Sequence, residues 1–149
     1  MQFDKDKVNQ MTTGSIPLAK FVGAEVIEME RGYVKMAMPF EQNVNHIGIM
    51  YAGSIFTLGE LPGGALFFSA FDATKCYPIV TEMSVKFLKP VKTAATVESR
   101  ISEEEIERVN REVEENGKSV YILEQEIKDD SGEICAITTA RYQARAHGR

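Results

Sequence analysis

The stretch from Ile47 to Phe71 most constrains how this chain can fold. It is almost entirely apolar or small, and its single acidic or basic side chain is Glu60. An ionised carboxylate is costly to bury unless it is paired, hydrogen-bonded or shifted to a higher pKa. Chance seldom leaves an acid at the centre of such a run, so Glu60 is the first candidate for chemistry.

A helix over Gly53–Phe71 would surround Glu60 with small residues and aromatic rings. The positions three, four and seven residues from the acid are Gly53, Phe56, Thr57, Gly63, Gly64 and Phe67. The glycines leave room for a ligand or a second helix to come close. Pro62 removes a helical hydrogen bond and disfavours helical angles at Leu61, so the sequence predicts a kink or short break beside Glu60.

A membrane span is the competing interpretation, because the stretch is long enough to cross a bilayer. Glu60 and Pro62 at its centre, its glycines and the lack of a basic flank favour a helix buried in a soluble domain instead. The net charge of -5 and the pI near 5.1 argue against a nucleic-acid binder. We therefore expect small molecules and copies of the same chain as partners, with no nucleic acid and no membrane.

The length of 149 residues, 44% of them hydrophobic and 26% charged, fits one domain over residues 1–149 with loose termini at 1–14 and 146–149. Cys76 and Cys135 show no metal-binding spacing, and the N-terminus lacks an apolar signal core, which predicts a reduced cytoplasmic setting. With only His46 and His147 as histidines, we expect no metal site. The sequence has no Gly-rich phosphate loop and no dinucleotide-binding fingerprint, so we expect no cofactor.

Periodicity predicts the remaining elements. They are a short helix between Pro17 and Gly23, a hairpin over 24–40, a strand over 78–90, another over 93–101, an exposed helix from Ser102 to Gly117, and a closing hairpin that turns at 129–132. In the strand over 78–90, alternation places Thr81, Met83, Val85 and Phe87 on one face. The elements predict an α+β fold in which one antiparallel sheet of about six strands wraps one long helix. The side of that helix left uncovered predicts a homo-oligomer, either a dimer or a dimer of dimers.

This order of elements resembles the hotdog-fold acyl-CoA thioesterases, in particular the branch of small phenylacetate-type and related thioesterases. In that family the loop and helix start read Asn, two residues, Gly, two residues, then His-Gly-Gly, with the catalytic acid nine residues past the His. The same spacing here gives Asn45, Gly48, Tyr51-Ala52-Gly53 and Glu60. The resemblance runs from about residue 15 to residue 145, and the later strand ends in a similar Phe-Leu-x-Pro.

The sequence departs from the family pattern at three positions. Tyr51 stands where many relatives have His, Ala52 where they have Gly, and Val80 where some have Ser. Spacing and strand order still indicate the fold. Function is less tightly specified, because the hotdog fold also serves dehydratases and noncatalytic acyl binders.

The resemblance implies hydrolysis of an acyl-CoA thioester with Glu60 as general base or nucleophile. Amides at the helix start, Ala52 and Gly53, would donate to the oxyanion. Asn45 would orient the thioester or Glu60, or serve as a turn residue, and Tyr51 would donate its hydroxyl or simply pack. The other candidates are Thr81, next to the vacated hydroxyl position, and Phe56 and Phe67, which with partner residues would set the depth of the acyl pocket.

Two other functions stay open. A noncatalytic acyl or acyl-CoA binding protein would keep the fold without the rate. A dehydratase-like enzyme would need a histidine with an acidic partner, and His46 is the only histidine near the helix start. Basic residues that could contact the phosphates of coenzyme A are Lys86, Lys89, Lys92 and Arg141, although such residues are usually solvated.

Overall fold

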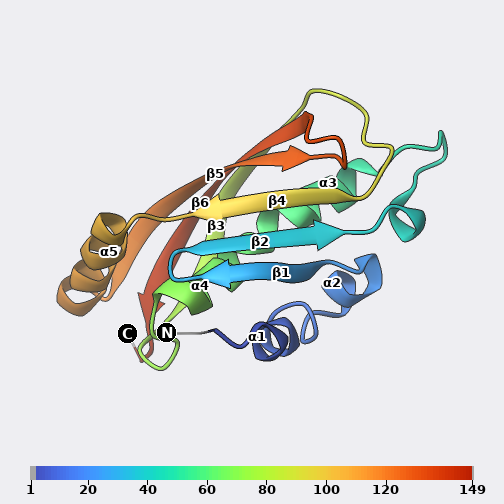
Figure 1. The fold of residues 1–149 in the computed structure, drawn as a ribbon. Helices are drawn as coiled ribbons and strands as arrows, with labels where there is room; N and C mark the ends of the chain where they lie inside the picture. Colours follow the sequence, from blue (N-terminus) through green and yellow to red (C-terminus); the bar gives the residue numbers. More distant parts are fainter. Residues whose placement is uncertain (1–2, 149) are drawn as a thin grey trace.

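The computed structural model describes residues 3–148 and confirms the α+β hotdog arrangement (Figure 1). Six strands form one antiparallel sheet in the order β1-β2-β4-β5-β6-β3. They are β1 (Glu25–Glu30), β2 (Tyr33–Met38), β3 (Cys76–Phe87), β4 (Ala95–Arg100), β5 (Lys118–Lys128) and β6 (Ile134–Ala146). The helices are α1 (Lys5–Met11), α2 (Pro17–Val22), α3 (Ala52–Glu60), α4 (Pro62–Ala70) and α5 (Glu103–Asn116), with one 3-10 turn, η1 (Glu41–Asn43).

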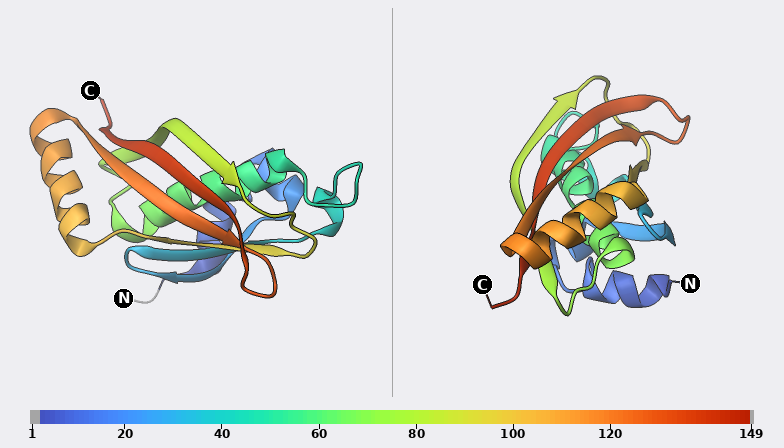
Figure 2. Two further views of the ribbon diagram at one scale, coloured as in Figure 1. Left: turned by 90° about the horizontal axis from the view of Figure 1, so that it is seen from above. Right: turned by 90° about the vertical axis from the view of Figure 1, so that its left-hand side faces the viewer.

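The sheet curves around α3 and α4, which together form the predicted central helix (Figure 2). Leu58 and Leu66 of this helix are fully buried, and so is Leu123 of β5 in the sheet. Burying each such side chain contributes about 1.5–3 kcal/mol. Every helix within residues 3–148 is too short or too polar to cross a bilayer.

The predicted break lies between α3 and α4, next to Pro62. Leu61 was expected to leave helical angles, but it keeps them, with φ of -56° and ψ of -36°. Its amide donates to the Thr57 carbonyl at 3.0 Å, so the two helices remain nearly continuous. Pro62 is tolerated because it takes the first position of α4, where an amide hydrogen has no intrahelical acceptor.

Residues 3–14 and 146–148, the described parts of the two termini, contact the rest of the domain. In α1, the Asn9 side chain donates to the Val26 carbonyl at 3.1 Å and accepts from the Val26 amide at 2.8 Å, which fixes the helix to β1. At the other end, the His147 amide donates to the Lys75 carbonyl at 3.0 Å. Arg149 lies outside the described residues.

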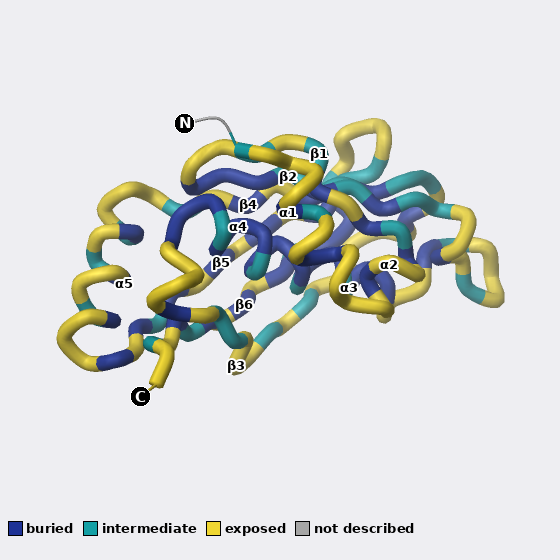
Figure 3. Tube along the Cα trace, turned by 90° about the horizontal axis from the view of Figure 1, so that it is seen from below, coloured by how far each residue is buried: buried dark blue, intermediate teal, exposed yellow. Residues whose placement is uncertain are grey.

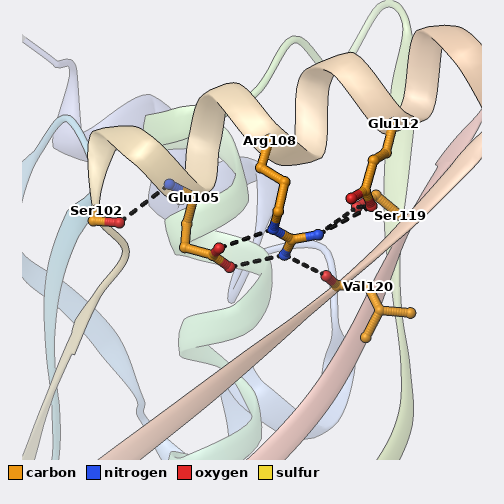
Figure 4. A network of polar contacts seen from close by, with 6 residues as sticks. All are labelled: Ser102, Glu105, Arg108, Glu112, Ser119 and Val120. Carbon is orange, nitrogen blue, oxygen red and sulfur yellow. Dashed lines mark hydrogen bonds and ion pairs between the residues drawn. The ribbon is translucent and has the colours of Figure 1, made fainter.

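The exposed helix α5 begins at the predicted capping residue, because Ser102 accepts from the Glu105 amide at 3.1 Å. Arg108 then links the helix to β5 (Figure 4). Its guanidinium forms two 2.8 Å hydrogen bonds with Glu105, one of 3.0 Å with Glu112 and one of 2.8 Å with the Val120 carbonyl. This network holds α5 at the end of the sheet remote from α3 (Figures 1 and 2).

Strand β3 forms one edge of the sheet and pairs with β6. Most of its residues are exposed or half-buried (Figure 3). Its register shifts between Val80 and Glu82, so Thr81 is a bulged residue and does not continue the alternation that ends in Met83, Val85 and Phe87. A long, exposed edge strand offers unpaired backbone groups to another chain.

Candidate active site

Glu60 ends α3 on the side of the central helix that the sheet leaves open. Residues at helical spacing along this side are exposed or half-buried; they are Gly53, Phe56, Thr57, Glu60, Gly64 and Phe68, here called the open stripe. A Cβ atom placed on Gly64 would meet nothing within 4 Å. The acid therefore borders free space along the helix.

Partial burial raises the pKa of the Glu60 carboxyl above its ordinary value. Desolvation disfavours the charged form, and within residues 3–148 no hydrogen bond or ion pair of the carboxylate opposes this effect. A carboxylate with a raised pKa is a better general base near neutral pH. The geometry and electrostatics of Glu60 both suit a role in proton transfer.

Asn45 organises the loop that leads into α3. Its side-chain Oδ1 accepts from the backbone amides of Ile47 at 3.0 Å and Ile49 at 3.2 Å, and its backbone amide donates to the Ile49 carbonyl at 2.7 Å. Within one chain Asn45 thus acts as a turn residue, one of the two roles considered for it. A contact with substrate or with Glu60 stays a prediction.

The start of α3 presents free backbone donors. Tyr51 is the N-terminal flanking residue, and its amide donates to the Asn43 carbonyl at 2.7 Å. The amides of Ala52 and Gly53 follow in the first turn, where a helix offers no acceptor, and both residues are exposed. Such amides and the positive end of the helix dipole favour a negatively charged oxygen. The Tyr51 side chain is also exposed, and its role stays a prediction.

One chain does not bring the free amides and the acid together. Gly53 and Glu60 are seven residues apart in a helix, which corresponds to about 10 Å along its axis. Groups that act on one thioester carbonyl must lie within hydrogen-bonding reach of its atoms or of the attacking water. The amides of Ala52 and Gly53 and the carboxylate of the same chain are therefore too far apart to serve one reaction centre.

A hollow of about 520 Å³ lies between α2, the loop over residues 42–46 and the first turns of α3. Leu18 and Phe21 of α2 face it, as do Tyr51 and Thr57, and its lining contains no Lys, Arg, Asp or Glu. Leu18 and Phe21 were not among the predicted site residues. The sequence did contain a signal for them, because a helix over residues 17–22 has apolar residues on both sides. In the structure Ala19 and Val22 face the core, while Leu18 and Phe21 remain exposed.

The remaining predicted residues divide between the open stripe, the core and the sheet edge. Phe56 is exposed on the open stripe, whereas Phe67 is buried and packs against Phe71, with ring centroids 5.2 Å apart. Thr81 donates its hydroxyl to the Arg141 carbonyl at 3.1 Å, which holds the bulge of β3. The structure does not place Phe67 or Thr81 on the open stripe, so their roles at the site stay predictions.

Val80, rather than Thr81, shares a face with the residue that touches Glu60. Val80 pairs with Tyr142 of β6, and directly paired residues lie on the same side of a sheet. The Tyr142 hydroxyl donates to the main-chain carbonyl of Glu60 at 2.8 Å. The position at which some relatives have Ser therefore lies on the same face of the sheet as Tyr142 and holds an apolar side chain here.

The fold and its helix with a single acid define a hotdog thioesterase, and comparison with known proteins supports this class. The structure is similar to a Pseudomonas aeruginosa protein described as a probable thioesterase, with a TM-score of 0.92, 42% identity and 99% coverage of both chains. The chain belongs to the family described as "Putative thioesterase (yiiD_Cterm)", whose model matches residues 5–146.

Two further relatives extend the comparison. A Sulfurisphaera tokodaii protein described as "Putative esterase" is 28% identical over 133 residues, which cover 89% of this chain and 90% of the relative. A hypothetical thioesterase of Streptococcus pneumoniae, solved with coenzyme A, shares the fold at a TM-score of 0.66 and 17% identity, covering 87% of this chain and 91% of the other. The Streptococcus pneumoniae structure shows the shared fold. The matching family, the Pseudomonas aeruginosa protein and the Sulfurisphaera tokodaii esterase indicate thioester hydrolysis as the general chemistry.

Proposed function

We propose that this chain hydrolyses acyl-CoA thioesters. The observation that carries the proposal is Glu60, the one acid on the open stripe of the central helix, whose carboxyl pKa is raised by burial. Coenzyme A bound to the Streptococcus pneumoniae relative supports the CoA form of the substrate. No cofactor is proposed, because the coenzyme A moiety is part of the substrate.

In the proposed reaction, Glu60 takes a proton from water while the water oxygen adds to the thioester carbonyl carbon. Alternatively, the carboxylate attacks that carbon itself and water hydrolyses the resulting anhydride. In both routes the carbonyl oxygen becomes negatively charged and accepts hydrogen bonds from the Ala52 and Gly53 amides. When the tetrahedral intermediate collapses, the carbon–sulfur bond breaks, which gives the carboxylic acid in the first route and the anhydride in the second. The thiolate of coenzyme A takes up the proton held by Glu60 in the first route and a proton from water in the second.

The reaction centre is proposed to form between two copies of the chain. Because Glu60 and the Ala52–Gly53 amides of one chain lie about 10 Å apart, the acid of one protomer would work with the amides of its partner. The open stripe and the unpaired edge of β3 provide adjoining surfaces for a twofold contact. The proposed assembly is therefore a homodimer or a dimer of dimers.

The hollow beside α2 is the proposed position of the acyl group. Its lining includes Leu18, Phe21 and Thr57 and carries no Lys, Arg, Asp or Glu, and its volume is typical of small-molecule sites. The lining also includes Gln42, Asn43, Asn45 and His46, but no Lys or Arg that would pair with a terminal carboxylate, so a neutral acyl group fits better. The proposed location is the cytoplasm, which the free thiols of Cys76 and Cys135 support.

A noncatalytic acyl-CoA binding protein is the second candidate, because Tyr51 replaces the family's histidine. Thiol release from neutral acyl-CoAs of several lengths and from a carboxylated acyl-CoA, measured with a thiol-reactive dye, separates the two. Release from the neutral substrates supports hydrolysis. Binding in calorimetry without release supports the binding protein, and the absence of both contradicts the whole proposal.

A further inference from the structure

Two side chains of the sheet bind the backbone of the central helix where it breaks. Pro62 has no amide hydrogen. The Gly64 amide donates to the Leu61 carbonyl at 3.2 Å instead of to the Glu60 carbonyl, its acceptor in a regular α-helix. The carbonyls just before the break are bonded from outside the helix. Gln125 of β5 donates from Nε2 to the Gly59 carbonyl at 2.7 Å, and Tyr142 donates to the Glu60 carbonyl at 2.8 Å.

The contact from Gln125 belongs to a buried cluster that leaves no room for a side chain at position 59 of the helix. Gln125 also donates to Thr138 Oγ1 at 3.0 Å, and both side chains are buried. A Cβ atom on Gly59 would lie 2.5 Å from the Thr138 methyl carbon. A larger residue at position 59 would therefore push the helix away from its two donors.

We propose that Tyr142 and Gln125 are positioning residues that fix the helix break and thereby aim the Glu60 carboxylate along the open stripe. The direction of a side chain follows from the backbone that carries it, and Tyr142 holds the main-chain carbonyl of the acid itself. This inference rests on the proposed function of Glu60. A displacement of about 1 Å in a catalytic group can lower a rate up to about 100-fold.

The chain offers a matched control in Tyr121 of β5. Its ring stacks on that of Tyr142 with centroids 5.5 Å apart, it is equally buried, and within residues 3–148 its hydroxyl has no hydrogen-bond partner. Tyr142→Phe and Tyr121→Phe thus remove the same atom from neighbouring rings. Only the first removes a bond to the helix.

Tyr142→Phe is expected to lower kcat about tenfold with little change in KM, while Tyr121→Phe keeps the parental kcat. Gln125→Met is expected to lower kcat in the same way. It provides a second route to the answer if Tyr142→Phe does not fold. Parental kcat in both Tyr142→Phe and Gln125→Met would overturn the proposal.

The protonation of Glu60 gives a readout that needs no activity. The side chains from the sheet that touch this turn are Met83, Gln125, Thr138 and Tyr142, and only Tyr142 titrates; burial raises its pKa, as does the Glu60 charge. If the break relaxes, Glu60 reaches water and its pKa falls toward the ordinary value.

Carbon NMR of side-chain carboxyls in parent, Tyr142→Phe and Tyr121→Phe should therefore show a lower Glu60 pKa in Tyr142→Phe alone. An unchanged titration in Tyr142→Phe would refute positioning. A parent that binds but does not hydrolyse acyl-CoA would refute the proposed function, while a shifted titration would still support the positioning role.

Discussion

A Cβ atom on Gly63 would lie 2.1 Å from the ring of Tyr142. The central helix and β6 thus approach so closely that no side chain fits between them. The next residue, Gly64, points to free space on the open stripe. The two adjacent glycines therefore lie on opposite sides of the helix: Gly63 packs against the sheet, and Gly64 is uncovered.

The first prediction compares these glycines. Gly63→Ala should lower the free energy of unfolding by about 2 kcal/mol, because the new methyl group must displace the buried ring of Tyr142. Gly64→Ala should change it by no more than about 1 kcal/mol, in the stabilising direction, since alanine favours the helix. Urea unfolding measures both. Equal destabilisation by the two changes would contradict the packing described here.

The second prediction concerns the Arg108 network. Its hydrogen bonds hold the pKa values of Glu105 and Glu112 below the ordinary value; for Glu112, the hydrogen bond from Ser119 is the larger cause. Carboxyls with lowered folded pKa values add stability above their unfolded pKa and lose it as pH falls through the folded pKa. Arg108→Gln should therefore lower the melting temperature at neutral pH, and the difference from the parent should shrink in acid. A difference that grows in acid would contradict this account.

The third prediction tests the hollow beside α2. Leu18→Trp should fill it and lower kcat/KM for long neutral acyl-CoAs about tenfold relative to short ones, because the longer chains lose their space. The matched control is Ile122→Trp, a similar change at an exposed position on β5, away from the hollow. Identical chain-length profiles for Leu18→Trp and the parent would remove the acyl group from this hollow.

The sequence predicted the central helix, its break and its acid because a long apolar run with one carboxylate and one proline has few stable arrangements. It could not show that Phe67 enters the core, because Gly63 and Gly64 lie three and four residues past Glu60 and the sequence does not say which of them the sheet covers. In the structure the open stripe continues through Gly64 and Phe68, while Gly63 and Phe67 are buried. Thr81 was placed by counting alternate residues, and an unpaired residue in a bulge interrupts that count without a mark in the sequence.

Other features depended on contacts between distant segments. The docking of α1 rests on the Asn9 amide and the backbone of Val26, a pairing that no local pattern reveals. Gln125 and Tyr142 lie on strands with a regular alternation of buried and exposed residues, and the pattern predicts them only as inward-facing residues. Their role at the helix break became visible only once the sheet was folded around α3.

The fourth prediction tests whether the reaction centre spans two protomers. Ala52→Pro removes one candidate oxyanion donor, and proline suits this first helical position because Tyr51 already has extended angles, with ψ of 136°. This variant should lose about 100-fold in kcat.

Sedimentation of the parent should show at least twice the 16.6 kDa chain mass, and a 16.6 kDa species at micromolar concentration would contradict the dimer.

Mixing Ala52→Pro chains with Glu60→Gln chains should then restore activity. A mixed dimer holds one intact centre, made from the acid of one chain and the amide of the other, so random exchange should give about a quarter of the parental rate. Each variant alone supplies the control. No recovery after verified subunit exchange would place the whole centre within one chain.

The central claim is that Glu60 is the catalytic group. Glu60→Gln keeps the size and polarity of the side chain, but the amide can neither accept a proton from water nor attack a thioester. The kcat for thiol release from a neutral acyl-CoA should fall at least about 100-fold, while the variant still folds and binds the substrate. Thiol release by Glu60→Gln at the parental rate would show that Glu60 is not the catalyst.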